Sequence, residues 1–103
     1  MAINKARSRD PNEAPERYAD LFQTLGDPTR LAALEHLASG EHRVRDLVDH
    51  LGYAQSTVSR HLGRLAELGL VARRADGRSS WYSLTDPARL GSLLIAARNL
   101  LQA

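Results

Sequence analysis

The chain has 103 residues, of which 43% are hydrophobic and 25% charged. This length suits a single domain with a modest core, and the balance is that of a folded globular protein rather than a disordered one. The absence of cysteine excludes disulfides, thiolate metal sites and thiol redox sensing. Because no apolar run is long enough to span a membrane and residues 1–10 lack the apolar core of a signal peptide, we expect a cytoplasmic protein with no membrane partner.

The positive charge of the chain is concentrated in one region. The net charge is only +2, but residues 55–84 carry five arginines against two acidic residues. The guanidinium group of arginine is better shaped than an ammonium group to bind phosphate and guanine. This distribution favours a local surface that contacts nucleic acid.

The N-terminal part of the chain is predicted to contain a flexible arm followed by a helix. Residues 1–14 are polar and form the arm, and one domain is expected over residues 15–103. From Pro15 the apolar residues follow the i, i+3, i+4, i+7 spacing of an amphipathic helix, which ends at Gly26.

Two further helices are predicted before residue 52. Asp27 and Pro28 supply an N-cap and a first-turn proline for a helix that ends near Gly40. A third helix is expected from about His42 to Leu51, and Gly52 stops it. The short linker of residues 52–54 then predicts the turn of a helix-turn-helix motif.

The helix expected at residues 55–68 has one apolar face and one polar face. On a helical wheel Val58, Leu62 and Leu65 face inward, while hydroxyl groups, arginines and Gly63 face outward. The outward residues are suited to base edges and phosphates in a DNA major groove, and they predict a recognition helix. The alternative is an ordinary amphipathic surface helix, but such helices usually carry mixed Glu and Lys, whereas Glu67 is the only acid here.

After Gly69 the periodicity changes from helical to alternating. Two predicted strands, residues 70–74 and 78–84, flank Ala75-Asp76-Gly77, and Asp-Gly between such segments is a strong hairpin signal. Arginines near its tip predict a wing that reaches phosphates or the minor groove, with a plain solvated hairpin as the alternative. The predicted DNA-binding residues of the helix and wing are Gln55, Ser56, Thr57, Ser59, Arg60, His61, Arg64, Arg73, Arg74 and Arg78.

The last predicted helix begins at Asp86-Pro87 and has a broad apolar side. This side needs a cover, which is either the first helix of the same chain or a second subunit, and we favour a homodimer. A two-fold dimer would place two recognition helices about 34 Å apart, one turn of DNA. The predicted interface residues are Tyr18, Phe22, Leu90, Leu93, Leu94, Ala97 and Leu101.

Three segments of the chain resemble the bacterial ArsR/SmtB family. They read LGDPTRLAALEHL, RVRDLVDHLGYAQSTVSRHLGRLAELGLV and RRADGRSSWYSL, and the resemblance extends roughly over residues 18–101. It implies a mainly α winged helix-turn-helix with four helices, a β-hairpin wing and a last helix. It also implies a homodimeric repressor that binds an imperfect palindrome in promoter DNA and changes affinity with a metal or another inducer.

The sensing residues that the resemblance implies are mostly missing. Family members that sense through the third helix have an ELCVCDL-like motif, in which both cysteines correspond to arginine here, at Arg43 and Arg45. Members that sense through the last helix use a D-x-H and a later H-x-x-E motif. The corresponding positions here are Asp86, Ala88, Asn99 and Gln102, so only the first is kept.

A different metal site is suggested by the third predicted helix. His42, Asp46 and His50 follow i, i+4 spacing, which lets neighbouring side chains share an ion. Histidine and carboxylate without thiol suit Ni(II) or Zn(II), which points to the nickel-responsive actinobacterial members of the family. The alternative is that these three residues are solvated side chains on a helix surface.

Two other classes of function compete with a DNA-binding regulator. The chain lacks the G-x-S-x-G, H-E-x-x-H and phosphate-binding glycine motifs, so an enzyme is not expected. A winged helix can also serve only as a protein interaction module that acts with a separate sensor partner protein. The arginine bias of the helix and wing favours double-stranded DNA as the partner.

Overall fold

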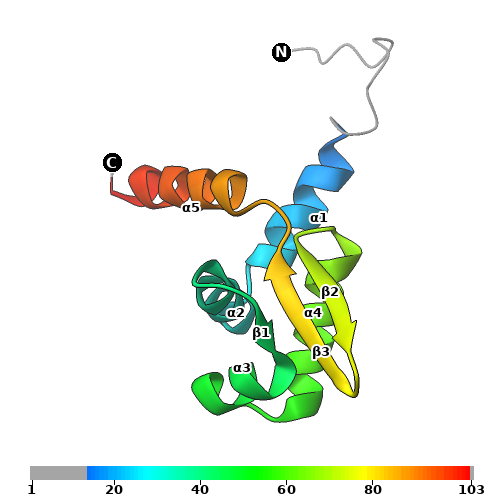
Figure 1. Cartoon of the computed structure of the whole chain (residues 1–103). Coiled ribbons are helices and arrows are strands. Elements are labelled where there is room, and N and C mark those ends of the chain that lie inside the picture. Colours follow the sequence, from blue (N-terminus) through cyan, green and yellow to red (C-terminus); the bar gives the residue numbers. More distant parts are fainter. Residues whose placement is uncertain (1–13, 103) are drawn as a thin grey trace, which may run out of the picture.

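The computed structural model describes residues 14–102 (Figure 1). The predicted arm lies almost wholly outside these residues. The described part contains five helices and one three-stranded antiparallel sheet of order β1-β3-β2, which confirms the predicted mainly α fold with a hairpin. The elements are α1 (Pro15–Leu25), α2 (Pro28–Ala38), β1 (His42–Arg43), α3 (Val44–Leu51), α4 (Gln55–Glu67), β2 (Val71–Asp76), β3 (Ser79–Leu84) and α5 (Pro87–Leu101).

Side-chain caps and prolines set the starts of α2 and α5. Oδ1 of Asp27 accepts hydrogen bonds from the backbone N–H groups of Thr29 (2.8 Å) and Arg30 (3.2 Å). These donors have no carbonyl partner within the helix, so the cap supplies the partner that the first turn lacks. Asp86 caps α5 in the same way through the N–H of Arg89 at 3.0 Å.

The third helix begins two residues later than predicted, because its expected first turn is a strand. His42 and Arg43 form β1 and pair with Tyr82 and Trp81 of β3. The backbone N–H of Arg43 donates to Oδ2 of Asp46 at 2.9 Å, which caps the helix and fixes its start at Val44. The predicted start at His42 was therefore wrong, whereas the predicted end of the helix at Leu51 is confirmed.

The first strand of the wing extends closer to the turn than predicted, and the turn is tighter. Strands β2 and β3 stay paired from Val71 opposite Leu84 to Asp76 opposite Ser79. The turn is therefore Gly77-Arg78, not residues 75–77 as expected. Gly77 has a φ of +60°, a left-handed conformation that a glycine adopts without steric cost.

The core is centred on the inner face of α4. Val58, Leu62 and Leu65 are each at most 1% exposed, which confirms the predicted inward face of this helix. They pack with apolar residues from every helix and from the sheet. The other buried members of this core are Leu25, Leu34, Leu37, Leu47, Val71, Tyr82 and Leu90.

Helices α1 and α5 lie at one end of the described chain, and α3 and the turn of the wing lie at the other (Figure 1). The second half of α5 extends away from the other elements, and residues 95–102 are exposed. None of the helices in residues 14–102 combines the length and the apolar character needed to cross a membrane.

Candidate nucleic-acid interface

The first turns of α4 present the polar surface that the sequence predicted. Gln55, Ser56, Ser59 and Arg60 are exposed, and Thr57 is half-buried. The buried leucines on the opposite side fix the orientation of the helix, so these polar side chains point to solvent as one group. Short hydroxyl groups beside an arginine can donate to and accept from base edges and phosphates.

A groove of about 440 Å³ runs between the starts of α3 and α4 and the wing. Gln55, Ser59 and Arg78 were predicted from the sequence, but Arg43 and Arg45 were not. The sequence signal for these two is the Arg43-Val44-Arg45 segment, which places two arginines close to the predicted recognition helix. The groove is lined by Arg43, Val44, Arg45, Gln55, Ser59, Arg78, Ser79, Ser80 and Tyr82.

Three exposed arginines on this side of the molecule carry uncompensated charge. Arg45 and Arg78 line the groove, and Arg60 lies on the exposed face of α4. The ion pairs formed among residues 14–102 include none of these three. Their guanidinium groups are therefore available to an anionic ligand such as the DNA backbone.

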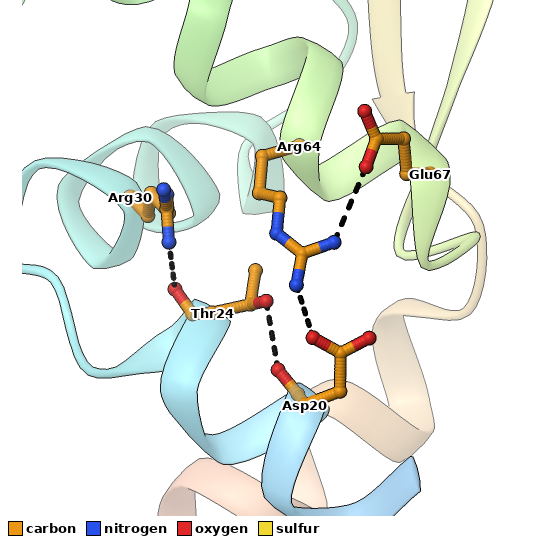
Figure 2. Close-up of polar contacts among 5 residues, drawn as sticks. All are labelled: Asp20, Thr24, Arg30, Arg64 and Glu67. Carbon is orange, nitrogen blue, oxygen red and sulfur yellow. Dashed lines mark hydrogen bonds and ion pairs between the residues drawn. The ribbon is translucent and has the colours of Figure 1, made fainter. Parts of the chain in front are cut away.

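Arg64 occupies a different position from the one predicted. Its guanidinium forms ion pairs with Asp20 of α1 and with Glu67, as Figure 2 shows, and its side chain is only 28% exposed. The distance from Nη1 to Oε2 of Glu67 is 3.2 Å. Arg64 thus connects α4 to α1, and its guanidinium is engaged by two carboxylates rather than free to read a base as predicted.

His61 was also predicted to contact DNA, but it is 7% exposed and belongs to the interior. Its Nδ1 accepts a hydrogen bond of 3.0 Å from Nε of Arg30, and Nη1 of Arg30 donates to the carbonyl oxygen of Thr24 at 3.2 Å. The contact between Arg30 and Thr24 is drawn in Figure 2. His61 therefore links α4 to α2 and to the end of α1, away from the exposed face.

Arg73 and Arg74 of the wing already have partners. Nε of Arg73 donates to Oγ of Ser80 at 2.9 Å. Arg74 forms a bidentate pair with Glu41, with distances of 2.7 and 3.1 Å. Hydrogen bonding to Arg74 lowers the pKa of Glu41, and the same contact raises the pKa of Arg74. Arg74 is thus partly neutralised, which reduces the charge that the wing offers to DNA.

Three side chains on one face of the sheet form a stack. Trp81 lies opposite Arg43 on one side and Arg74 on the other, with the guanidinium carbons 5.1 and 5.6 Å from the ring centre. These are cation–π distances. Nε1 of Trp81 is buried without an acceptor among the described residues, so the ring is held by its faces rather than by a hydrogen bond.

The predicted dimer residues fall into two groups. Tyr18 and Phe22 of α1 are 47% and 58% exposed, and Ala97 and Leu101 of α5 are also exposed. Leu90 is buried in the core, and Leu93 and Leu94 pack against it, so these three serve the fold of one chain. The exposed apolar surface also includes Leu100, which belongs to the predicted apolar side of the last helix, and Ile95, which does not.

The predicted metal ligands His42, Asp46 and His50 do not form one ligand set. Both carboxylate oxygens of Asp46 accept hydrogen bonds from Arg43, and these bonds lower the pKa of Asp46. In residues 14–102 no group of three His, Cys, Asp or Glu side chains is arranged to hold an ion. Asp46 is therefore a capping residue, and the histidines lie beside His36 instead.

Comparison with known proteins identifies the family to which this fold and surface belong. Residues 27–73 match the model of the arsR family of bacterial regulatory proteins. A probable mercury resistance operon repressor of Streptomyces lividans is 38% identical over 100 residues, which cover 97% of this chain and 79% of that protein. The chain belongs to the ArsR family.

Solved structures agree with this assignment. The crystal structure of Rv0081 from M. tuberculosis has a TM-score of 0.76 at 34% identity and covers 91% of this chain and 92% of its own. The homodimeric winged helix-turn-helix DNA-binding domain of Mb0332 from Mycobacterium bovis, solved by NMR, has the same TM-score at 29% identity, with 96% and 91% covered. The ArsR-family chain is thus a winged helix-turn-helix protein, and membership in a family of regulators confirms that it is not an enzyme.

Proposed function

We propose that this ArsR-family protein is a homodimeric transcriptional repressor that binds a palindromic promoter site. In this proposal the start of α4 enters the major groove, where Gln55, Ser56, Thr57, Ser59 and Arg60 read the bases. The wing and the start of α3 contact phosphates. The observation that carries the proposal is the groove between α3, α4 and the wing, beside which the charges of Arg45, Arg60 and Arg78 have no ion-pair partner among residues 14–102.

Dimerisation is proposed to occur through α1 and α5. The exposed aromatic residues of α1 and the exposed apolar residues of the second half of α5 lie at the same end of the molecule (Figure 1). Large apolar side chains left exposed at one end of a small domain indicate a protein interface. The support from a relative is that the Mb0332 domain is homodimeric.

The test separates base reading from phosphate contact. We expect Arg60→Ala to reduce the preference for the operator over random duplex, at a cost of about 1–3 kcal/mol for a lost base contact. Arg78→Ala should weaken all duplexes alike and should reduce the slope of log K against log salt by about one. Fluorescence anisotropy with labelled operator and random duplexes over a salt series measures both quantities.

Arg89→Ala is the matched control, because Arg89 is 91% exposed but lies at the start of α5, paired with Asp86. It should leave both duplex affinities within about twofold of wild type. The same uniform loss in Arg60→Ala and Arg78→Ala would contradict the separate roles. No affinity for any duplex at low salt would instead support an interaction module that acts with a sensor partner.

We further propose that Ni(II) or Zn(II) changes the affinity of the dimer for DNA. The support is that a relative is named as a mercury resistance operon repressor, and that this chain offers histidine and carboxylate but no thiol. Imidazole and carboxylate ligands suit these borderline ions better than soft ions that prefer sulfur. Operator affinity measured with and without each ion tests this response.

A further inference from the structure

Three of the four histidines of the chain lie together on α2, β1 and α3. The ring centres of His36 and His50 are 5.0 Å apart, with the rings stacked. The ring of His42 is edge-on to both, at 6.5 Å from His36 and 6.3 Å from His50. We call these three residues the histidine cluster. The fourth histidine, His61, is apart from them and bonded to Arg30.

The ring of His42 is already held in a form that can bind a metal. Its Nδ1 lies 2.8 Å from the carbonyl oxygen of Gly40. A carbonyl oxygen only accepts hydrogen bonds, so Nδ1 carries the proton, and in the neutral ring Nε2 keeps a free lone pair. Metal-binding histidines are commonly oriented by such a bond from the other ring nitrogen to a backbone carbonyl.

The distances within the histidine cluster are close to those of a three-histidine site. With a metal–nitrogen bond of about 2.0–2.1 Å, ring centres that share one tetrahedral ion lie roughly 5 Å apart. His36 and His50 have this separation, but their rings are stacked at 19°, so their nitrogens do not point at one common position. The ring of His42 lies more than 1 Å farther out, so the ligand set is open as it stands. His50 is exposed and the other two are half-buried, so a side-chain rotation can close it.

We propose that the histidine cluster binds one divalent transition-metal ion, Ni(II) or Zn(II), through one ring nitrogen each of His36, His42 and His50, with water in the remaining positions. The proposal rests on the proposed metal response and names the site that would carry it. It replaces Asp46 by His36 in the set predicted from the sequence, because Arg43 occupies both oxygens of Asp46.

Such an ion would join α2, β1 and α3, of which β1 and α3 contribute residues to the groove beside α4 and the wing. His42 is opposite Tyr82 of β3, so β1 connects the histidine cluster to the wing. His50 lies in the last turn of α3, and the start of this helix lines the groove. A bound ion would therefore restrain the wing relative to α3, which is the geometry that sets the width of the groove.

The experiment uses untagged full-length protein, because a histidine tag would bind the same ions. Zn(II) is titrated while NMR follows the ring nitrogens of all four histidines, and Ni(II) and Zn(II) affinities are measured by calorimetry. We expect the ring signals of His36, His42 and His50 to shift with one ion per chain, and that of His61 to stay unchanged. Alanine at any of the three positions should lower the affinity by more than about tenfold.

Asp49→Asn is the matched control, because Asp49 is an exposed neighbour of His50 outside the histidine cluster. It should keep the affinity within about twofold of wild type. If an alanine variant does not fold, the wild-type ring signals decide alone. Tight binding that leaves these rings unchanged, shifts only one of them, or is lost in Asp49→Asn would overturn the site.

Measurements of operator affinity distinguish the proposed ion-binding site from the proposed metal response. Ion binding by the three rings without a change in operator affinity would keep the site and remove the proposed response. An operator affinity that still responds to Ni(II) or Zn(II) in a His36→Ala/His50→Ala variant would keep the response and overturn the site.

Discussion

At the scale of single residues, Asp27 shows how one side chain determines both a helix start and a pH dependence. Partial burial acts to raise its pKa, but the backbone N–H groups of Arg30 and Thr29 and nearby positive charge lower it below its usual value overall. Folding therefore favours the ionised carboxylate. The stabilisation is fully present above about pH 3.9, the usual value for the unfolded chain, and is lost as the pH falls through the lower folded value.

We predict that Asp27→Ala lowers the free energy of unfolding by about 1 kcal/mol at pH 7, because two N–H groups of α2 lose their acceptor. Urea denaturation at a fixed protein concentration measures this loss. Asp27→Asn should remain near wild type at pH 7, since asparagine also caps helices, but should lose less stability in acid. An alanine variant as stable as wild type would contradict the capping role.

Residue types on α4 could be read from the sequence, but their partners could not. The wheel placed Val58, Leu62 and Leu65 inward correctly because a 3.6-residue period is a local property. It also placed Arg64 on the polar side, where its partner Asp20 is 44 residues away in the chain. Periodicity carries no information on such a pair, so it predicts a base-reading role for a residue that holds two helices together.

At the scale of elements, α4 is fastened to α1 by two polar connections. One is the ion pair between Arg64 and Asp20. The other runs from His61 through Arg30 to the carbonyl of Thr24. Figure 2 shows the ion pair and the contact of Arg30 with Thr24. The side chains of Arg64 and Asp20 are 28% and 41% exposed, and His61 is 7% exposed, so both connections are shielded in part from solvent. The proposed dimer helix and the proposed recognition helix are thus held in one orientation.

We predict that Arg64→Ala lowers stability by up to about 1 kcal/mol, as for a partly exposed ion pair, without changing the preference for operator over random duplex. Asp20→Arg should be worse, because two cations then face each other. The double change Asp20→Arg/Arg64→Asp should recover part of the loss, limited by repulsion between the new Asp and Glu67. Urea denaturation and anisotropy on both duplexes measure these effects.

A selective loss of operator affinity in Arg64→Ala, with stability unchanged, would return Arg64 to the base-reading residues. If the effects of the two single substitutions simply add in the double variant Asp20→Arg/Arg64→Asp, the contact between Arg64 and Asp20 does not contribute to stability.

The strand β1 illustrates what periodicity misses at this scale. It has two residues, too few to show alternation, and it exists because Trp81 and Tyr82 provide a paired edge about forty residues later. By contrast, the hairpin was predicted because its turn and both strands are adjacent in sequence. The bounds of the strands were wrong by one or two residues, since Asp76 continues the first strand to its pair with Ser79 and the turn is shorter.

At the scale of the whole molecule, α1 and α5 contain most of the large apolar side chains that the described part of the chain leaves exposed to solvent. Phe22 is 58% exposed, and Leu100 and Leu101 are 76% and 87% exposed. Leu90 on the same helix is buried, so α5 divides into a part that serves its own chain and a part that does not. The sequence showed one continuous stripe, because spacing alone does not say where a helix leaves the body of its chain.

We predict that Phe22→Asp/Leu100→Asp converts a dimer to a monomer, because both charges would be buried in the interface. Sedimentation measures the mass, and operator affinity should fall by at least about tenfold because one recognition helix then binds alone. Ala38→Asp, an exposed change at the end of α2, is the control and should leave the mass unchanged. A double variant that remains dimeric would place the interface elsewhere.

The stack of Arg43, Trp81 and Arg74 has a practical consequence. Trp81 is the only tryptophan of the chain. Its indole lies between the guanidinium of Arg43, at the edge of the groove beside α3, α4 and the wing, and the guanidinium of Arg74 in the wing. The neighbouring residue Tyr82 pairs with His42 of the histidine cluster. Any ligand that draws either arginine away from the indole changes the surroundings of this one fluorophore. The intrinsic fluorescence of Trp81 should therefore report, without a label, the binding of both proposed ligands, DNA and the metal ion.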